Sequence, residues 1–536
     1  MGISVGITLF ARREKSVMTQ RSKLLRSPYL EIIIMISSVV LSYFGLIILG
    51  AVPETPADGV MATSTVVAIQ FALFMLSVAI ALISVIAGIG GGVIFTPIML
   101  AFTSVNSVVV RGAGLIVAMF SGLISTGIFI KKGLCEYRTA LLMTISQAIG
   151  ALIGALLAIG LASSTGATGE GVLRLSLGLV LVALAVYFLT GGKKLEHPEV
   201  RKVDRLSASL HLDGEYFEES EGRMFPYKVH RVGWATLLIL LVGFIGGFFG
   251  MGGGWAITPV LNVCMGLPMK VAAASSGAIL GIGSCVSIWA YMSAGAIIPF
   301  FVLPWLAGQV IGGFIGSYAL ARIKVHTVRL ILIGIMFFTS FGLVTKALST
   351  LGMMKNPSSM TQVIVFTVII ALVILAIVLD KRKASGKSAP AVQTEQAAAP
   401  EPKLPTSVRC YATVVHVITI VSSILALFAP LVILINPSAN ILNPNRIFQV
   451  IFSGGSIEEI WALSSTGSFP GAHYFMTNMS ASDSWAQIAI SLGCSVGLWA
   501  LLPTVVIQYF KEKNFVWATL GLLFIALIVL SILGVF

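Results

Sequence analysis

Residues 88–97 read GIGGGVIFTP, and residues 250–259 read GMGGGWAITP. The two stretches share the pattern G-x-G-G-G-x-x-x-T-P and lie 162 positions apart. The same offset pairs Gln147 with Gln309, and the register between the two copies continues without a gap. Coincidence does not explain agreement over this length. The sequence therefore predicts two structurally similar halves.

The composition places the chain in a membrane. Of its 536 residues, 57% are hydrophobic and 10% are charged, whereas a soluble domain carries about 25% charged residues. Many runs of about 18 or more apolar residues read as membrane-spanning helices. A barrel is excluded because its strands are only about 9–11 residues long and alternate in polarity. The lipid bilayer is thus the first expected partner.

The net charge of +13 does not indicate nucleic acid. The Lys and Arg residues flank apolar runs, as the positive-inside rule expects, and we predict no nucleic-acid partner. The five cysteines and six histidines show no metal-ligand spacing, so neither a metal nor another cofactor is expected. No nucleophile, carboxylate pair or metal cluster lies within the spans, which argues against an enzyme.

The apolar runs and the polar stretches between them divide the chain. Two runs, 66–102 and 232–266, are too long for one span, and each is interrupted by glycines and then a proline, which predicts a broken helical hairpin. The predicted regions are an N-terminal cytoplasmic segment with a first helix (1–60), a first repeat (66–190), a cytoplasmic loop (191–231), a second repeat (232–350), an additional helix (361–379), a flexible linker (380–409) and a C-terminal three-helix membrane region (410–536).

Loop charges set the orientation of the repeats. The loop 131–138 is basic and its equivalent near 293–300 is uncharged, whereas 163–174 is poor in cations and its equivalent near 322–329 is basic. Equivalent loops therefore lie on opposite sides, and the duplication is predicted to be inverted. The predicted fold is an all-α polytopic membrane protein of the cell membrane. Its N-terminus is expected in the cytoplasm and its C-terminus outside.

The glycine clusters are the first candidates for a binding site. Glycine lets backbone N–H groups approach a ligand closely, and a helix N-terminus beside it attracts anions. Two symmetric clusters could form cradles for a small anion near the membrane midplane. Close helix packing is the structural alternative. The predicted residues are Gly90, Gly91, Gly92, Gly252, Gly253 and Gly254.

Polar side chains within the repeats are the remaining candidates. Ser275 and Ser276 stand near a helix start, and Gln147 and Gln309 lie in apolar helices, where a buried amide needs a partner. Helix–helix hydrogen bonding remains the alternative for the glutamines. Arg111 begins a helix near the first glycine cluster and either binds an anion or reaches to the interface. No Asp or Glu lies well inside a span of the repeated core, so a carboxylate proton relay is not expected.

The chain resembles the sulfite exporter TauE/SafE family of membrane permeases. The resemblance lies in the doubled G-x-G-G-G-x-x-x-T-P pattern, in AAASSGAIL at 272–280 and in GGFIGSYALARI at 312–323, and it covers about residues 66–350. It implies transport of sulfur-containing anions such as sulfite, sulfoacetate or thiosulfate. Alternating access between the halves is the leading mechanism, and an anion channel without a coupling ion is the alternative. The sequence leaves the particular anion, the coupling ion and the oligomeric state open.

Overall fold

The structure is a computed structural model that describes residues 28–52, 60–87, 89–190, 203–218, 223–319, 325–355 and 404–536, with scattered positions in the stretches between. Gly88, the segment before residue 28, most of 361–379 and most of the linker 380–409 lie outside these residues. The described elements are α2 (Pro28–Gly50), α3 (Thr63–Ala87), α4 (Gly92–Phe102), α5 (Ser107–Lys131), α6 (Tyr137–Thr190), α7 (Arg205–Leu210), β1 (Gly214–Glu218), β2 (Arg223–Tyr227), α8 (Val232–Phe249), α9 (Gly254–Pro259), the π-helix η1 (Val260–Cys264), α10 (Met269–Ser293), α11 (Pro299–Ala319), α12 (Val325–Thr350), α14 (Thr406–Ile435), the 3-10 helix η2 (Pro437–Ala439), α15 (Pro444–Ser453), α16 (Ile457–Ala462), α17 (Tyr474–Thr477), α18 (Ser482–Cys494), α19 (Val496–Phe510) and α20 (Phe515–Ile532).

The predicted all-helical membrane fold is confirmed. Within the described residues, ten helical segments are long and apolar enough to cross a membrane. The single element α6 contains two spans, Tyr137–Ser164 and Thr168–Tyr187, and kinks where Gly166 takes a non-helical conformation. In the predicted three-helix region 410–536, α18 and α19 meet at a 45° bend, where the helix is interrupted at Ser495.

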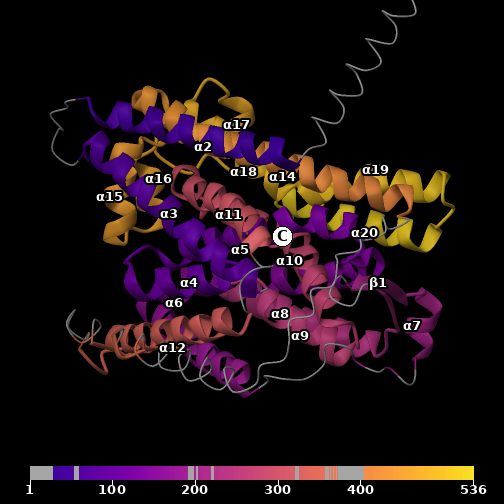
Figure 1. Cartoon of the computed structure of the whole chain (residues 1–536). Helices are drawn as coiled ribbons and strands as arrows, with labels where there is room; N and C mark the ends of the chain where they lie inside the picture. The colour runs from indigo at the N-terminus through magenta and orange to yellow at the C-terminus, as the bar shows by residue number, and fades with distance from the viewer. Residues whose placement is uncertain are drawn as a thin grey trace, which may run out of the picture.

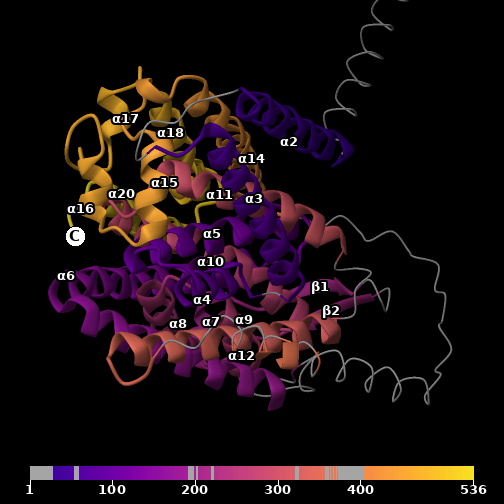
Figure 2. The same cartoon turned by 90° about the vertical axis from the view of Figure 1, so that its left-hand side faces the viewer.

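The helices form layers around a buried centre. Almost every side chain of α5 and α10 is buried, and the C-terminal helices cover one side of this pair while α6, α8 and α12 cover the other (Figures 1 and 2). The outer helices keep large apolar side chains exposed, such as Leu157, Leu241 and Val516. Such a surface is stable only against lipid, which agrees with a membrane-spanning bundle.

One helix of each repeat packs against the other repeat. A methyl group built on Gly150 of α6 would lie 2.0 Å from the carbonyl oxygen of Leu240 in α8. The equivalent methyl on Gly312 of α11 would lie 2.5 Å from the carbonyl oxygen of Val78 in α3, and Val78 is the residue 162 positions before Leu240. Each half thus packs one glycine-lined helix against the first helix of the other half, where only glycine permits so close an approach.

The glycine clusters break the helices as predicted. α3 ends at Ala87 and α4 begins at Gly92, and α8 ends at Phe249 before α9 begins at Gly254. Positive φ angles at Gly90 (78°), Gly250 (69°) and Gly252 (69°) require glycine at the breaks. The short helix after each break spans residues 92–102 or 254–264. At 1.5 Å per residue each is about 16 Å long, roughly half of the hydrocarbon core.

Residues 203–218 and 223–231 fold into a small cap at one end of the bundle. The antiparallel hairpin β1–β2 brings Glu218 against the ammonium of Lys270 at the start of α10, and Tyr216 donates a hydrogen bond of 3.1 Å to the same carboxylate. Asp204 caps α7 and also accepts a hydrogen bond of 2.7 Å from the Arg231 backbone before α8. The middle of the predicted cytoplasmic loop is therefore ordered against the membrane helices.

Candidate functional site

The two glycine breaks lie against each other. A methyl group on Gly92 would stand 2.6 Å from the carbonyl oxygen of Met251, and one on Gly254 would stand 2.4 Å from that of Ile89. Ile89 and Met251 are equivalent positions of the repeat, so the contact is reciprocal. Thr96 strengthens it by donating a hydrogen bond of 2.7 Å to the Gly250 carbonyl. The fold thus brings both glycine clusters to one crossing point.

Side chains of α5 and α10 surround the crossing. Leu280 of α10 contacts the breaks on both sides, since methyl groups on Gly90 and Gly252 would lie 2.6 and 2.7 Å from its δ carbons. On the other helix, the Ser121 hydroxyl accepts a hydrogen bond of 3.0 Å from the Gly91 backbone N–H. The Gly91 N–H, one of the backbone donors predicted to bind an anion, therefore already has a hydrogen-bond partner within the protein.

Gln309 is held in place beside the first glycine cluster. Its side chain is fully buried, and its amide nitrogen donates to the backbone oxygen and the hydroxyl of Ser77, each at 3.1 Å. Its amide oxygen faces Gly91, 2.5 Å from where a methyl group would stand, and has no hydrogen-bond partner among the described residues. The structure thus joins Gln309 to the glycine crossing.

Gln147, the equivalent glutamine, has a different environment. It is fully buried, yet neither atom of its amide has a hydrogen-bond partner within the part of the chain that the structure describes. Its amide oxygen lies 1.8 Å from the position of a methyl group on Gly283. The repeat explains the difference, because the positions of Ser77 and Ser121 are taken by Ile239 and Gly283 in the second half. The second half has lost both hydroxyls.

The two predicted serines face different ways. Ser276 accepts a hydrogen bond of 2.8 Å from the Thr258 hydroxyl and so contacts the short helix after the second break. Ser275 lies instead beside the Cys135 thiol at the start of α6, and burial raises the pKa of that thiol to about 12. Ser276 belongs with the glycine crossing, whereas Ser275 belongs with the capped end of the bundle.

Arg111 is buried at the start of α5, close to Gly250. Its guanidinium donates to the carbonyl and hydroxyl oxygens of Ser107 at 3.0 and 2.8 Å and to the carbonyl oxygen of Ala158 at 3.4 Å. All three acceptors are neutral. A pocket of about 270 Å³ opens beside it. The side chain therefore lies inside the protein instead of reaching to the interface.

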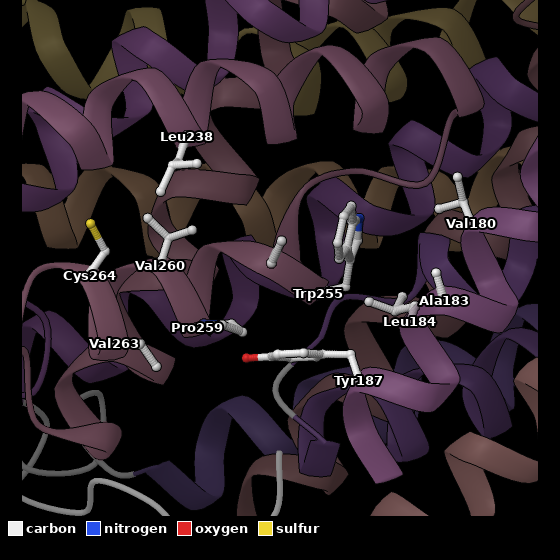
Figure 3. Close-up of a pocket in the computed structure, with 11 residues that line it drawn as sticks. Val180, Ala183, Leu184, Tyr187, Leu238, Trp255, Pro259, Val260, Val263 and Cys264 are labelled. Carbon is white, nitrogen blue, oxygen red and sulfur yellow. The ribbon is translucent and has the colours of Figure 1, made fainter. Parts of the chain in front are cut away.

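A larger pocket of about 460 Å³ lies between α6, α8 and the α9–η1 segment (Figure 3). Trp255, which directly follows Gly254, and Tyr187 of α6 border it, and no charged residue lines it. The equivalent place in the first half is closed by α12, where Phe338 stacks on Phe102 with ring centroids 4.7 Å apart. The apolar lining makes this pocket unsuitable for an anion.

Metal chemistry finds no support in the described residues, which contain no group of three or more His, Cys, Asp and Glu side chains able to hold an ion. Sequence reasoning missed Ser77 as the partner of Gln309. It also did not single out Glu170 and Arg174, which form an ion pair of 2.8 Å near Arg111. Aligning the two repeats would have pointed to Ser77, because its hydroxyl is replaced by the apolar side chain of Ile239 at the equivalent position.

A helical membrane core with two broken helices crossing at its centre defines a membrane transporter. The family model described as "Sulfite exporter TauE/SafE" matches residues 72–343, about half of the chain. The chain therefore belongs to the sulfite exporter TauE/SafE family. This membership confirms the expected family and the expectation of a transporter and not an enzyme.

The comparisons with individual proteins agree with this assignment. The "Probable membrane transporter protein YunE" of Bacillus subtilis (strain 168) is 24% identical over 252 residues, which cover 46% of this chain and 86% of that protein. A second family model, whose description names no activity, matches residues 409–535. No solved structure matches the chain.

Proposed function

We propose that the protein is a permease for small anions, of the sulfur-containing kind such as sulfite, sulfoacetate or thiosulfate. One observation carries the proposal, namely the fully buried, unpartnered Gln147 amide in the helix core that surrounds the glycine crossing. A buried amide without a partner is costly, and an oxyanion that accepts its N–H groups would remove that cost. The family membership supports the sulfur-containing class.

The proposed binding site lies where the two breaks cross. Its residues are the two glycine clusters with Gln147, Gln309 and Ser276, and Arg111 serves the approach to it. Small residues let the backbone N–H groups of the clusters come near a ligand, and the short helices that begin at Gly92 and Gly254 orient their N-termini there. Ser275, which faces Cys135, contributes indirectly by placing Ser276.

Alternating access is the proposed mechanism. The reciprocal packing of the halves supports two units that rock about their shared crossing. The closed contact between Phe102 and Phe338 in the first half and the open pocket at its second-half equivalent also support it. In the opposite access state, the contact between Phe102 and Phe338 would open and the pocket in the second half would close. Both halves carry the same glycine pattern at their helix breaks, so either half could take up the open or the closed contact.

The proposed orientation puts the capped end in the cytoplasm, the N-terminus inside and the C-terminus outside. Basic residues support it. Lys270 pairs with the cap through Glu218, and Arg138 donates to the backbone oxygen of His211 in the cap at 3.0 Å. The exposed Lys131 and Lys132 lie in the same loop as Arg138.

Flux into proteoliposomes tests the proposal. Purified protein is expected to move sulfite, thiosulfate or sulfoacetate faster than sulfate or phosphate, with saturation and counterflow. The Gly91→Leu variant should insert normally but lose flux, because its side chain would occupy the space of the Gln309 amide. No flux of any of these anions by the wild-type protein would refute the proposal. Resolved single-channel currents without counterflow would identify an anion channel instead.

A further inference from the structure

Buried cations gather at the end of the bundle opposite the cap, where α5 begins. Arg111 and Arg174 are 1% and 6% exposed. The Glu170 carboxylate, whose side chain is 28% exposed, forms an ion pair of 2.8 Å with Arg174. Both arginines lie within electrostatic reach of this one carboxylate. Arg111 forms no ion pair of its own in the described parts of the chain.

Lys346 of α12 adds a third cation. Its ammonium donates to the carbonyl oxygen of Thr103, directly after α4, and it lies within electrostatic reach of Arg174 and Glu170. Three cations therefore lie within electrostatic reach of one carboxylate, and Arg174 forms the ion pair with it. The Nε atom of Arg174 has no hydrogen-bond partner among the described residues. Charge and hydrogen-bonding capacity are both in excess at this place.

The positive-inside rule does not account for these cations. They lie at the far end of α5 from Lys131, and Lys131 belongs to the loop that packs near the cap. Cations placed for topology stay in water, whereas Arg111 and Arg174 are buried. Burying a cation without a counter-ion is costly, so the cluster is set up for a negatively charged partner beyond Glu170.

A pocket opens beside Arg111 and Glu170, whereas Arg174 and Lys346 are not among its lining residues. The cavity of about 270 Å³ is lined by Arg111, Glu170, Thr168 and Ser176, with Phe248 of α8 among its apolar walls. Thr168 follows closely on the kink at Gly166, where the φ and ψ angles of 52° and −141° take α6 out of helical geometry. Glu170 and Ser176 therefore line the cavity from the part of α6 that follows this kink.

We propose that Arg111, Arg174 and Lys346 form an anion-capture site at this end of the bundle, where an oxyanion takes the place of the Glu170 carboxylate as the partner of Arg174. Arginine suits this role because its planar fork binds oxyanions with two parallel hydrogen bonds. Arg111 connects the pocket with the glycine crossing, since its backbone contacts Gly250. The inference rests on the proposed function and adds to it a first binding step that is distinct from the central site.

Two charge variants that should change the anion affinity in opposite directions test the capture site. Binding of radiolabelled sulfite and sulfoacetate to the purified full chain is measured at fixed salt, together with the unfolding midpoint of each variant. Glu170→Gln removes the competing carboxylate and should tighten binding several-fold. Arg174→Gln should weaken it roughly tenfold or more, the size expected for a hydrogen bond to a charged group. Lys131→Gln, on the same helix as Arg111 but at its other end, is the control and should leave affinity unchanged.

Each result decides a different question. If Glu170→Gln binds no tighter than wild type, or if Lys131→Gln weakens binding as much as Arg174→Gln, the capture site is wrong and only a general charge effect remains. Should Arg174→Gln fail to fold, Glu170→Gln still decides, because it keeps both arginines. A wild-type protein that neither binds nor moves these anions refutes the proposed function itself, whereas normal wild-type flux with unaltered Glu170→Gln affinity refutes only the capture site.

Discussion

Replacing each of the two equivalent glutamines by leucine separates a binding role from a structural role. Gln147 and Gln309 occupy the same position in the two halves and are both fully buried. Among the residues that the structure describes, only Gln309 finds side-chain hydrogen-bond partners, since its amide donates to the backbone and hydroxyl oxygens of Ser77. Leucine keeps most of the volume and removes the amide. The two variants should therefore change stability in opposite directions.

The magnitudes follow from the hydrogen bonds. Gln309→Leu loses two bonds, and at about 0.6 kcal/mol for an average hydrogen bond between membrane helices the loss is about 1 kcal/mol. Ser77 stays satisfied because its hydroxyl donates to the Trp305 carbonyl at 2.6 Å. Gln147→Leu removes a buried amide that has no partner, which by itself costs about 1–3 kcal/mol. Its free energy of unfolding should therefore rise by an amount of that order.

Although Gln147→Leu should make the protein more stable, it should weaken transport. If the Gln147 amide donates to the anion, its loss removes a hydrogen bond to a charged group, worth about 1.5–3 kcal/mol. The KM for sulfite should then rise by roughly 10- to 150-fold, since 1.4 kcal/mol corresponds to a factor of ten. Gln309→Leu should change KM less, because its amide nitrogen is already occupied by Ser77.

Thermal unfolding in detergent and initial rates in proteoliposomes measure the two quantities on the same preparations. A more stable Gln147→Leu protein with a raised KM would support the substrate-binding role. The reasoning is refuted if Gln147→Leu is destabilised as much as Gln309→Leu and transports normally. That result would mean that Gln147 has a structural partner in the folded protein. The difference in hydrogen bonding between Gln147 and Gln309 would then have no role in transport.

Three further variants test the glycine crossing and the cap. Gly254→Ala places a methyl group 2.4 Å from the backbone oxygen of Ile89 and should lower stability by about 1–3 kcal/mol with a loss of flux. Gly253→Ala meets only side chains, Ile257 Cδ1 at 3.0 Å and Val242 Cγ1 at 3.1 Å, and should cost less than Gly254→Ala; equal unfolding midpoints for the two variants would contradict this expectation. At neutral pH the Cys135 thiol, whose pKa burial raises to about 12, should react slowly with a water-soluble maleimide. Tyr227→Ala should speed this alkylation several-fold by opening the cap above it, whereas an unchanged rate would show that Tyr227 does not shield the thiol.

The asymmetry of the halves has a consequence for the transport cycle. Within the described residues, a hydroxyl partner is found for Gln309 and not for Gln147, and Phe102 of the first repeat stacks on Phe338 of the second. Under the alternating access proposed above, these differences would make the two states of the halves unequal in energy. The proposed anion-capture site would likewise lie at one end of the bundle only.

The sequence by itself determined the membrane class, the duplication and the positions of both helix breaks. It could do so because the length of an apolar run and the position of a glycine cluster are properties of a short stretch of chain and do not depend on how the helices pack. The candidate glycines were likewise visible, since a repeated glycine pattern reports a repeated backbone requirement. The relative orientation of the repeats stays a prediction from loop charges.

Only the tertiary structure decided what each polar residue touches. It brought both glycine breaks to one crossing, tied Gln309 to Ser77 and left the Gln147 amide without a partner. It also placed Ser275 beside Cys135 and brought Arg111 and Lys346, from separate helices, within electrostatic reach of Glu170 and Arg174. These relations depend on side chains that are distant in sequence and meet across helix interfaces. Spacing along the chain carries no information about such contacts, because they are fixed by how the helices pack.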